Sequence, residues 1–242
     1  MAAAGSTWST EEWTAAVLAA KPRVAVFDCD GTLWEKDSGF EFMRWSLEQG
    51  LVSRHASEWL SARYREYRAG TVDEATICGE MVQVYAGLRE AELQQAAAQF
   101  FASVVEPTIF PAMQQLVSAL QQDGCEIWAV SSTADWVVEA GVGERFSIGA
   151  ERVLAARVKA VDGVATGTLL AVPTDEAKAV ALRAAGIAEP DAVFGNSVHD
   201  LAMLEMARRA YPVNPSEALL AEAEQRGWPV FRPDRALAAA RR

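Results

Sequence analysis

Two aspartates that follow a short apolar run constrain this chain more than any other feature. Residues 23–28 read RVAVFD, and Asp28 and Asp30 bracket a single cysteine. The apolar, β-branched run comes directly after a proline and predicts a buried strand. Two carboxylates crowded at the end of such a strand repel each other strongly unless a cation neutralises them. The feature therefore predicts a strand that ends in a charged, functional site.

Further apolar runs extend this first strand into a sheet. Strands are expected at 125–131, 191–196 and 210–214, with a weaker one at 228–231. Helical patterns are expected at 111–124, 174–186 and 199–210. Strands that alternate with helices predict an α/β fold with a parallel, doubly wound sheet. Ligands bind such sheets at the carboxyl ends of the strands, where Asp28, Ser131 and Asn196 fall.

The segment 36–105 has a different character. It shows no convincing strand and is rich in helix formers. It is therefore interpreted as a helical cap domain inserted into a core made of 1–35 and 106–242. Within the core, 157–172 predicts a β-hairpin that turns at Asp162 and Gly163, a pair typical of tight hairpins. A short N-terminal helix is expected, capped near Ser9.

The composition limits the size of the fold and the classes of binding partner and cellular location that we expect. The chain has 242 residues, of which 51% are hydrophobic, enough for one α/β core with an insertion. The net charge of -11 disfavours a nucleic-acid partner. No apolar run is long enough to cross a bilayer, and the N-terminus lacks the basic region of a signal peptide. Three cysteines without metal spacing favour a reducing compartment, so a cytoplasmic location is predicted. The oligomeric state stays open.

The paired aspartates suit phosphoryl transfer. Mg²⁺ is commonly held by one or two carboxylates together with substrate phosphate. One aspartate can then attack phosphorus to form an aspartyl-phosphate. A second carboxylate can protonate the leaving oxygen and later activate water. Gly31 permits the tight turn that follows, and Thr32 offers a hydroxyl to fix the loop.

Four motifs in order give the chain a family resemblance. The segment DCDGTLW resembles the first motif, DxDGT, of the haloacid dehalogenase (HAD) superfamily. The strand that ends in Ser131 resembles motif II, Lys178 resembles the lysine of motif III, and 193–205 resembles motif IV. The helical insertion after motif I is similar to the C1-type cap of the phosphoserine-phosphatase-like branch. The resemblance covers nearly the whole chain and implies a Mg²⁺-dependent phosphatase acting on a small phosphomonoester.

The resemblance also implies individual roles. Asp28 is the expected nucleophile and Asp30 the expected general acid/base, with Lys178 offsetting negative charge. The expected metal ligands are Asp28, Asp30, Asn196 and Asp200, the last through water. The expected phosphate ligands are Ser131 with the backbone amides of Ser132 and Thr133.

Three positions leave the family pattern or leave alternatives open. Asn196 replaces the first acidic residue of motif IV, which predicts weaker metal binding because an amide contributes only a dipole. His199 either donates to phosphate or caps the following helix. Trp34, directly after motif I, is either core or part of the substrate site.

The substrate is only partly constrained. The resemblance implies that an acid shortly after motif I reads a substrate amine, a role for Asp37 or Glu35, with Asp37 better aligned. At 79–81, where the resemblance leads us to expect an arginine that reads a carboxylate, none occurs. The pattern thus argues against phosphoserine and favours an amine-bearing ester without a carboxylate. Two other functions stay open: phosphoryl transfer to an alcohol, and non-catalytic binding of a phosphoester.

Overall fold

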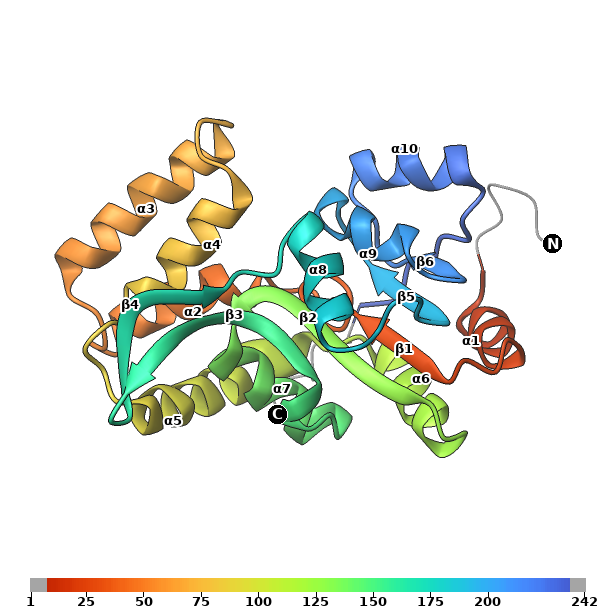
Figure 1. Cartoon of the computed structure of the whole chain (residues 1–242), viewed down its shortest axis with the longest axis horizontal. Coiled ribbons are helices and arrows are strands. Elements are labelled where there is room, and N and C mark those ends of the chain that lie inside the picture. Colours follow the sequence, from red (N-terminus) through yellow and green to blue (C-terminus); the bar gives the residue numbers. More distant parts are fainter. Residues whose placement is uncertain (1–7, 236–242) are drawn as a thin grey trace, which may run out of the picture.

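A six-stranded sheet forms the centre of the computed structural model, which describes residues 8–235. The strand order is β4-β3-β2-β1-β5-β6 (Figure 1). The strands are β1 (Val24–Phe27), β2 (Glu126–Ala134), β3 (Val153–Val161), β4 (Val164–Ala171), β5 (Ala192–Gly195) and β6 (Ala210–Pro212). All neighbouring strands are parallel except β3 and β4, which form an antiparallel hairpin at the edge. The predicted α/β class is confirmed.

Alternation along the central strand builds two apolar layers. Ala25 and Phe27 of β1 face one hydrophobic cluster, and Val26 faces the other. The same alternation occurs in β5, where Phe194 and Val193 lie in opposite clusters. Because successive strand residues point to opposite faces, a strand buried on both sides is apolar throughout. This explains why the short run before Asp28 contains no polar residue after Arg23.

Helices cover both faces of the sheet. On the side of Phe27 lie α1 (Thr10–Ala19), α6 (Pro111–Gln122) and α7 (Asp135–Phe146). The other face is covered by α8 (Glu176–Ala184), α9 (Leu201–Glu205) and α10 (Glu217–Arg226). Short 3-10 turns occur at Glu106–Thr108, Ala150–Arg152 and Val198–Asp200. The helix α1 begins at a capping box of Ser9 and Glu12, as predicted.

Four helices occupy the predicted cap segment. They are α2 (Ser38–Glu48), α3 (Arg54–Arg68), α4 (Glu74–Gln83) and α5 (Glu90–Phe100), the last continued by a π-helical turn at Phe101–Val105. Met43, Leu60 and Ile77 share a small cluster among α2, α3 and α4. The apolar residues of α5 instead join the large cluster of the core. The division of the chain at 36 and 105 stays a prediction.

The hairpin of β3 and β4 is bonded to the cap. The Gly87 amide donates to the Ala165 carbonyl at 2.8 Å, and the Ala165 amide donates to the Leu88 carbonyl at 2.9 Å. A Cβ on Gly79 of α4 would come within 2.8 Å of a Leu169 methyl group. The glycine at this position therefore permits close packing of α4 on the hairpin.

Several sequence expectations need correction. The weak strand at 228–231 is wrong: only a single bridge joins Phe231 to Val213. The helix expected at 199–210 is much shorter, because a 3-10 turn precedes α9 and the chain leaves the helix after Glu205. The strand expected to end at Ser131 continues to Ala134. The hairpin is confirmed, and its first strand also pairs with β2.

No helix described between residues 8 and 235 is long and apolar enough to cross a membrane. The three cysteines, Cys29, Cys78 and Cys125, are free and buried. The cytoplasmic location stays a prediction.

Candidate active site

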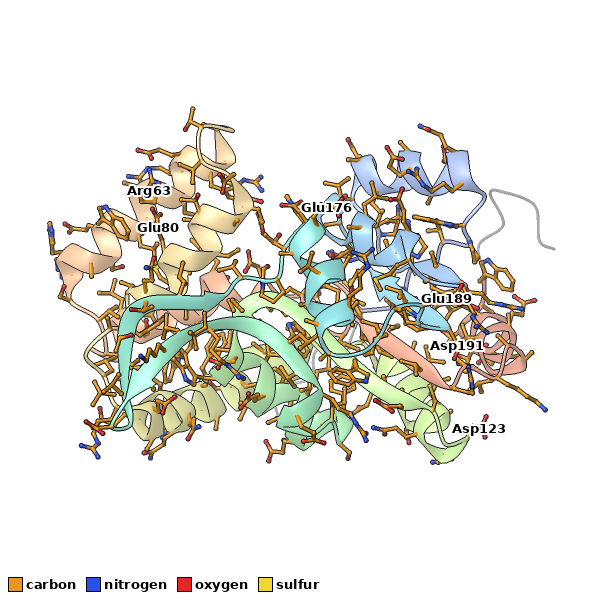
Figure 2. The ribbon with its side chains drawn as sticks, viewed as in Figure 1. Arg63, Glu80, Asp123, Glu176, Glu189 and Asp191 are labelled. Carbon is orange, nitrogen blue, oxygen red and sulfur yellow. The ribbon has the colours of Figure 1, made fainter. Side chains whose placement is uncertain are left out.

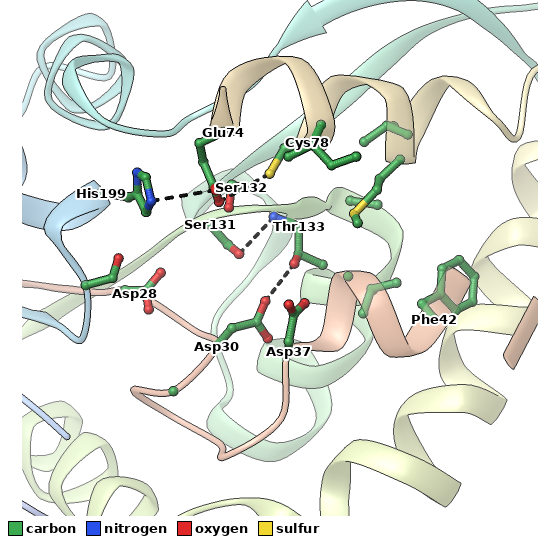
Figure 3. Close-up of a pocket in the computed structure, with 18 of the residues that line it drawn as sticks. Asp28, Asp30, Asp37, Phe42, Glu74, Cys78, Ser131, Ser132, Thr133 and His199 are labelled. Atoms are coloured by element: carbon green, nitrogen blue, oxygen red, sulfur yellow. Dashed lines mark hydrogen bonds and ion pairs between the residues drawn. The ribbon is translucent and has the colours of Figure 1, made fainter. Parts of the chain in front are cut away.

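The candidate site lies where β1 and β5 end beside β2, which continues past them to Ala134. Phe27 pairs with Ala129 on one side and Phe194 on the other. The Asp28 amide continues the ladder by donating to the Phe194 carbonyl at 2.9 Å. The predicted residues of three motifs therefore meet at one edge of the sheet (Figure 3). A cavity of about 280 Å³ opens above them, lined by both core and cap residues.

A buried lysine links two aspartates at the floor of this cavity. Lys178 Nζ lies 2.7 Å from Asp28 Oδ1 and 2.6 Å from Asp200 Oδ1. All three residues are buried. Burial alone lowers the pKa of Lys178, but the charges of Asp200 and Asp28 outweigh it and raise that pKa above its ordinary value. The lysine therefore stays charged and neutralises one of the two carboxylates.

The negative charge of Asp28 is only partly neutralised, because Lys178 is shared with Asp200. Burial raises the pKa of Asp28 to about 7, and the charge of Asp200 adds to this shift while Lys178 opposes it. Its second oxygen accepts a hydrogen bond from the Thr32 hydroxyl at 3.0 Å. A buried carboxylate that is easily protonated in this state gains from any additional positive charge brought to it.

Asp200 is held by the loop that precedes it. Its Oδ2 accepts hydrogen bonds from the amides of Asn196 and Ser197 at 2.8 and 2.9 Å. A Cβ on Gly195 would approach the Asp200 side chain to 2.7 Å, so only glycine leaves room here. Both Asp200 oxygens are thus engaged by protein groups, and the carboxylate is aimed at Lys178.

Asp30 is anchored more heavily than Asp28. Its Oδ1 accepts from Trp34 Nε1 at 2.6 Å, from the Ser38 amide at 2.9 Å and from the Ser38 hydroxyl at 2.5 Å. Its Oδ2 accepts from the Thr133 hydroxyl at 2.7 Å. Trp34 is fully buried, does not line the cavity, and acts on the site through this hydrogen bond.

Asn196 lies directly against the loop of motif I. A Cβ on Gly31 would come within 1.9 Å of Asn196 Nδ2. Gly31 also has a φ of +75°, a conformation that favours glycine. The glycine is therefore required both by the turn and by the close approach of Asn196.

Residues in the second half of β2 form one side of the cavity. Ser131 is buried, and its Oγ accepts a hydrogen bond from the Thr133 amide at 3.1 Å. Ser131, Ser132 and Thr133 all line the cavity. The Thr133 amide, expected to face phosphate, is engaged by Ser131 in this structure.

The cap side of the cavity is acidic and aromatic. Asp37 lines it and also caps α2 through the Phe40 amide at 3.0 Å. Desolvation by the surrounding residues raises the pKa of Asp37 to about 6, and the negative charge of Asp30 adds to this shift. Glu74 of α4 lines it as well, and Glu74 Oε2 is buried without a hydrogen-bond partner among the described residues. Glu35 completes the acidic lining near motif I.

His199 connects core and cap. Its Nδ1 lies 2.7 Å from Asp175 Oδ1, and its Nε2 lies 3.6 Å from Glu74 Oε2. Asp175 precedes α8 and has a φ of +48°. His199 lines the cavity and links motif IV to α4 of the cap, and its contact with phosphate stays a prediction.

Sequence reasoning missed several cavity residues. Glu74, Tyr64 and Tyr67 line the cavity, as does Arg68 at the end of α3. Arg63 instead forms an ion pair with Glu80 of α4, with Nη2 and Oε1 2.9 Å apart (Figure 2). Tyr64, Tyr67 and Arg68 share one helical face by their spacing, which is the only sequence signal that could have grouped them.

The donor set at the floor fits Mg²⁺ better than a softer metal. No group of three or more His, Cys, Asp or Glu side chains within 8–235 is arranged to hold a metal ion. Oxygen donors nevertheless line the cavity at Asp28, Asp30 and Asn196. Mg²⁺ prefers such oxygens and commonly keeps several waters, so it needs few protein ligands.

Comparison with known proteins identifies the family. The model of the haloacid dehalogenase-like hydrolases matches residues 25–205. The chain therefore belongs to the haloacid dehalogenase-like hydrolase family. It is 26% identical over 219 residues to a histidinol-phosphatase of Neisseria meningitidis, covering 86% of this chain and 97% of that protein. It is 29% identical over 217 residues to a probable phosphatase of Mycobacterium tuberculosis, covering 86% and 74% of the two chains.

Solved structures show the same fold. A protein of unknown function from Bordetella pertussis has a TM-score of 0.76 at 24% identity, covering 87% of this chain and 98% of that one. A substrate-bound phosphoserine phosphatase has a TM-score of 0.60 at 16% identity, covering 88% and 94%. These likenesses show the fold of the predicted phosphoserine-phosphatase-like branch, and the family match confirms the predicted superfamily.

Proposed function

We propose that this hydrolase, a phosphatase of the haloacid dehalogenase family, cleaves a small phosphomonoester by transferring the phosphoryl group to Asp28. The observation that carries the proposal is the shared lysine, with Nζ 2.7 Å from Asp28 and 2.6 Å from Asp200. It holds the Asp28 carboxylate at a strand end, facing a cavity, and offsets part of its charge. Such a group is a suitable nucleophile for phosphorus.

Asp30 is the proposed acid and base. It protonates the leaving oxygen as the ester bond breaks, and it takes a proton from water when the aspartyl-phosphate is hydrolysed. Lys178 offsets charge on Asp28 and the phosphoryl group throughout. Ser131 and the amide of Ser132 are proposed to hold phosphoryl oxygens.

Mg²⁺ is the proposed cofactor. Asp28, Asn196 and the main-chain carbonyl of Asp30 would hold it, and Asp200 would contribute through water. When bound, the ion supplies positive charge that lowers the repulsion between a carboxylate and a phosphate dianion. Because Asn196 contributes no net charge, the requirement for added Mg²⁺ is expected to be higher than with a carboxylate there.

The proposed substrate carries a positive charge away from its phosphate. Asp37, Glu35 and Glu74 line the cavity beyond the floor, and Arg68 is the arginine found in that lining. Glu35 pairs with Arg235 at 3.1 Å, so Asp37 and Glu74 are the carboxylates that we expect to attract a cationic group. The named function of the Neisseria relative, a histidinol-phosphatase, agrees with this chemistry. An amino alcohol phosphate without a carboxylate, such as L-histidinol phosphate, is therefore the proposed substrate class.

Two other functions are tested by the same assay. A phosphotransferase would pass the phosphoryl group to an added alcohol, so phosphate release would fall as a phosphorylated alcohol appeared. A non-catalytic binding protein would release no phosphate. The retained pair Asp28 and Asp30 supports catalysis over binding alone.

The test is phosphate release from L-histidinol phosphate, 2-aminoethyl phosphate, phosphoserine and glycerol 3-phosphate, with Mg²⁺ and with excess chelator. Release is expected with Mg²⁺ only, and Asp28→Asn is expected to abolish it because an amide cannot attack phosphorus. Asp123→Asn, at the far end of α6, is the matched control and is expected to behave as wild type. Near wild-type turnover by Asp28→Asn would contradict the mechanism, and full turnover in chelator would contradict the cofactor.

A further inference from the structure

The carboxylate of Asp30 accepts four hydrogen bonds from protein groups, whereas that of the proposed nucleophile, Asp28, accepts two. Trp34 Nε1, the Ser38 amide and the Ser38 hydroxyl all donate to its Oδ1, whereas Thr133 Oγ1 donates to its Oδ2. These donors come from the loop after β1, from the first residue of α2 and from β2. Three separate segments thus fix one side chain.

The two oxygens of Asp30 differ in what their partners permit. An indole N–H and a backbone N–H donate and cannot accept. A proton on Oδ1 would therefore face two hydrogens that cannot move aside, and of the three donors to Oδ1 only the Ser38 hydroxyl can rotate. A threonine hydroxyl donates or accepts as it rotates. Thr133 can thus reverse its hydrogen bond when Oδ2 carries a proton.

We propose that Trp34 and Ser38 are positioning residues that hold Oδ1 of Asp30 and leave Oδ2 as the oxygen that moves the proton. The inference rests on the proposed function of Asp30. In the first step the proton on Oδ2 passes to the leaving oxygen as the bond from that oxygen to phosphorus breaks and the bond from Asp28 forms. In the second step Oδ2 takes a proton from the water whose oxygen attacks phosphorus, and the bond to Asp28 breaks.

The surroundings of Trp34 suit a positioning role. Its ring is fully buried and meets Phe101 edge-on, with centroids 5.1 Å apart. Its backbone forms a bridge to Ile109, and the Gly31 amide donates to the Trp34 carbonyl at 2.7 Å. The indole is therefore fixed on both sides, so its N–H is aimed at Asp30 without freedom to turn away. Ser38 is equally buried.

The test compares two phosphate esters whose leaving groups differ in whether they must be protonated to depart. An alkyl alkoxide departs only with a proton from a general acid, whereas p-nitrophenolate departs without one. Trp34→Phe keeps a buried ring and removes only the N–H donor. Ser38→Ala removes one hydroxyl and is the second variant. Trp45→Phe, whose ring packs against Phe42 and Phe100 away from Asp30, is the control.

Trp34→Phe is expected to lower kcat/KM for L-histidinol phosphate about tenfold, the effect of losing one hydrogen bond to a charged group. Its kcat/KM for p-nitrophenyl phosphate is expected to stay close to wild type, because kcat/KM covers only the steps through phosphoryl transfer to Asp28. Ser38→Ala is expected to show the same selectivity with a smaller loss. Trp45→Phe is expected to change neither value.

Equal losses with both esters would overturn the inference, since a general disturbance of the fold lowers both. No loss with the alkyl ester in either variant would also overturn it. If Trp34→Phe fails to fold, Ser38→Ala decides the question alone. A wild-type protein that releases phosphate from neither ester contradicts the proposed function itself, and the inference then falls with it.

Discussion

The floor and the roof of the cavity differ in how far their carboxylates are paired with other protein groups. At the floor, formed by Asp28, Asp30, Lys178 and Asp200 of the core, almost every charged atom has a protein partner at hydrogen-bond distance. At the roof, formed by cap residues, Glu74 Oε2 is buried without such a partner among residues 8–235, and Asp37 uses one oxygen to cap its own helix. The floor is organised before substrate arrives, whereas the roof has more carboxylates than cations, with Asp37 and Glu74 against Arg68.

This difference separates the two tasks of the proposed enzyme. Phosphoryl transfer requires groups that are already aimed, because reorganising them during the reaction costs free energy. Recognition of the alcohol portion requires groups whose pairing is completed by the substrate itself. If the proposed function holds, we expect the strand ends of the core to carry out the reaction and the inserted helices to set substrate selectivity.

The largest expected effect comes from removing the cation of the floor. Lys178→Met leaves the carboxylates of Asp28 and Asp200 buried near each other without the cation that they share. Loss of one partner from a buried ion pair typically costs about 3–5 kcal/mol of unfolding free energy. Urea unfolding at pH 8 without Mg²⁺ measures this loss, and phosphate release is expected to vanish.

The control for that change is Lys159→Met, which removes an exposed lysine of β3. It is expected to leave both stability and activity as in wild type. If the two variants were equally stable, the floor would not depend on the buried pair, and the contrast with the roof would disappear.

A smaller effect is expected from a pair of glycines, one in each region. Gly31 and Gly70 have nearly the same φ, +75° and +76°. Alanine at either position is expected to cost about 1–2 kcal/mol of unfolding free energy, because a side chain is strained in this left-handed conformation. Only at Gly31 does the new Cβ also meet Asn196, whereas nothing lies near Gly70.

Gly31→Ala is therefore expected to lower phosphate release and raise the Mg²⁺ requirement, and Gly70→Ala to change stability alone. Thermal unfolding and a Mg²⁺ titration of activity separate the two outcomes. Equal activity losses would show that the cap loop near Gly70 matters to the reaction as much as the floor does.

The smallest expected effect concerns recognition by Asp37. Its pKa of about 6 lies above the ordinary value, so the carboxylate is charged only above that pH and its attraction for a cation is lost as pH falls through 6. The KM for 2-aminoethyl phosphate, divided by the KM for glycerol 3-phosphate, should therefore rise on acidification. The ratio cancels the titration of the phosphate itself.

Asp37→Asn keeps a good helix cap and should remove this pH dependence. At pH 8 it is expected to raise the ratio about fivefold, the effect of an ion pair worth about 1 kcal/mol in an accessible cavity. A ratio that follows pH equally in both proteins would assign the cation to Glu74 or to another group.

The amino-acid sequence by itself determined the fold class and the floor. Apolar runs of strand length, followed by Asp28, Ser131 and Asn196, were enough to bring these residues together, because parallel strands align their carboxyl ends at one edge. The short N-terminal helix and the hairpin at Asp162 and Gly163 were equally readable, since a capping box and a turn depend only on neighbouring residues.

The roof and the anchoring of Asp30 were decided only by the tertiary structure. Glu74, Tyr64 and His199 come from three elements, and their meeting depends on how α3 and α4 rotate and pack over the core. Trp34 reads as an apolar residue after a motif, yet the fold turns its indole N–H onto Asp30. Local patterns specify which face of an element is apolar, but the direction of a polar atom across elements follows from side-chain packing, which depends on residues far apart in the chain.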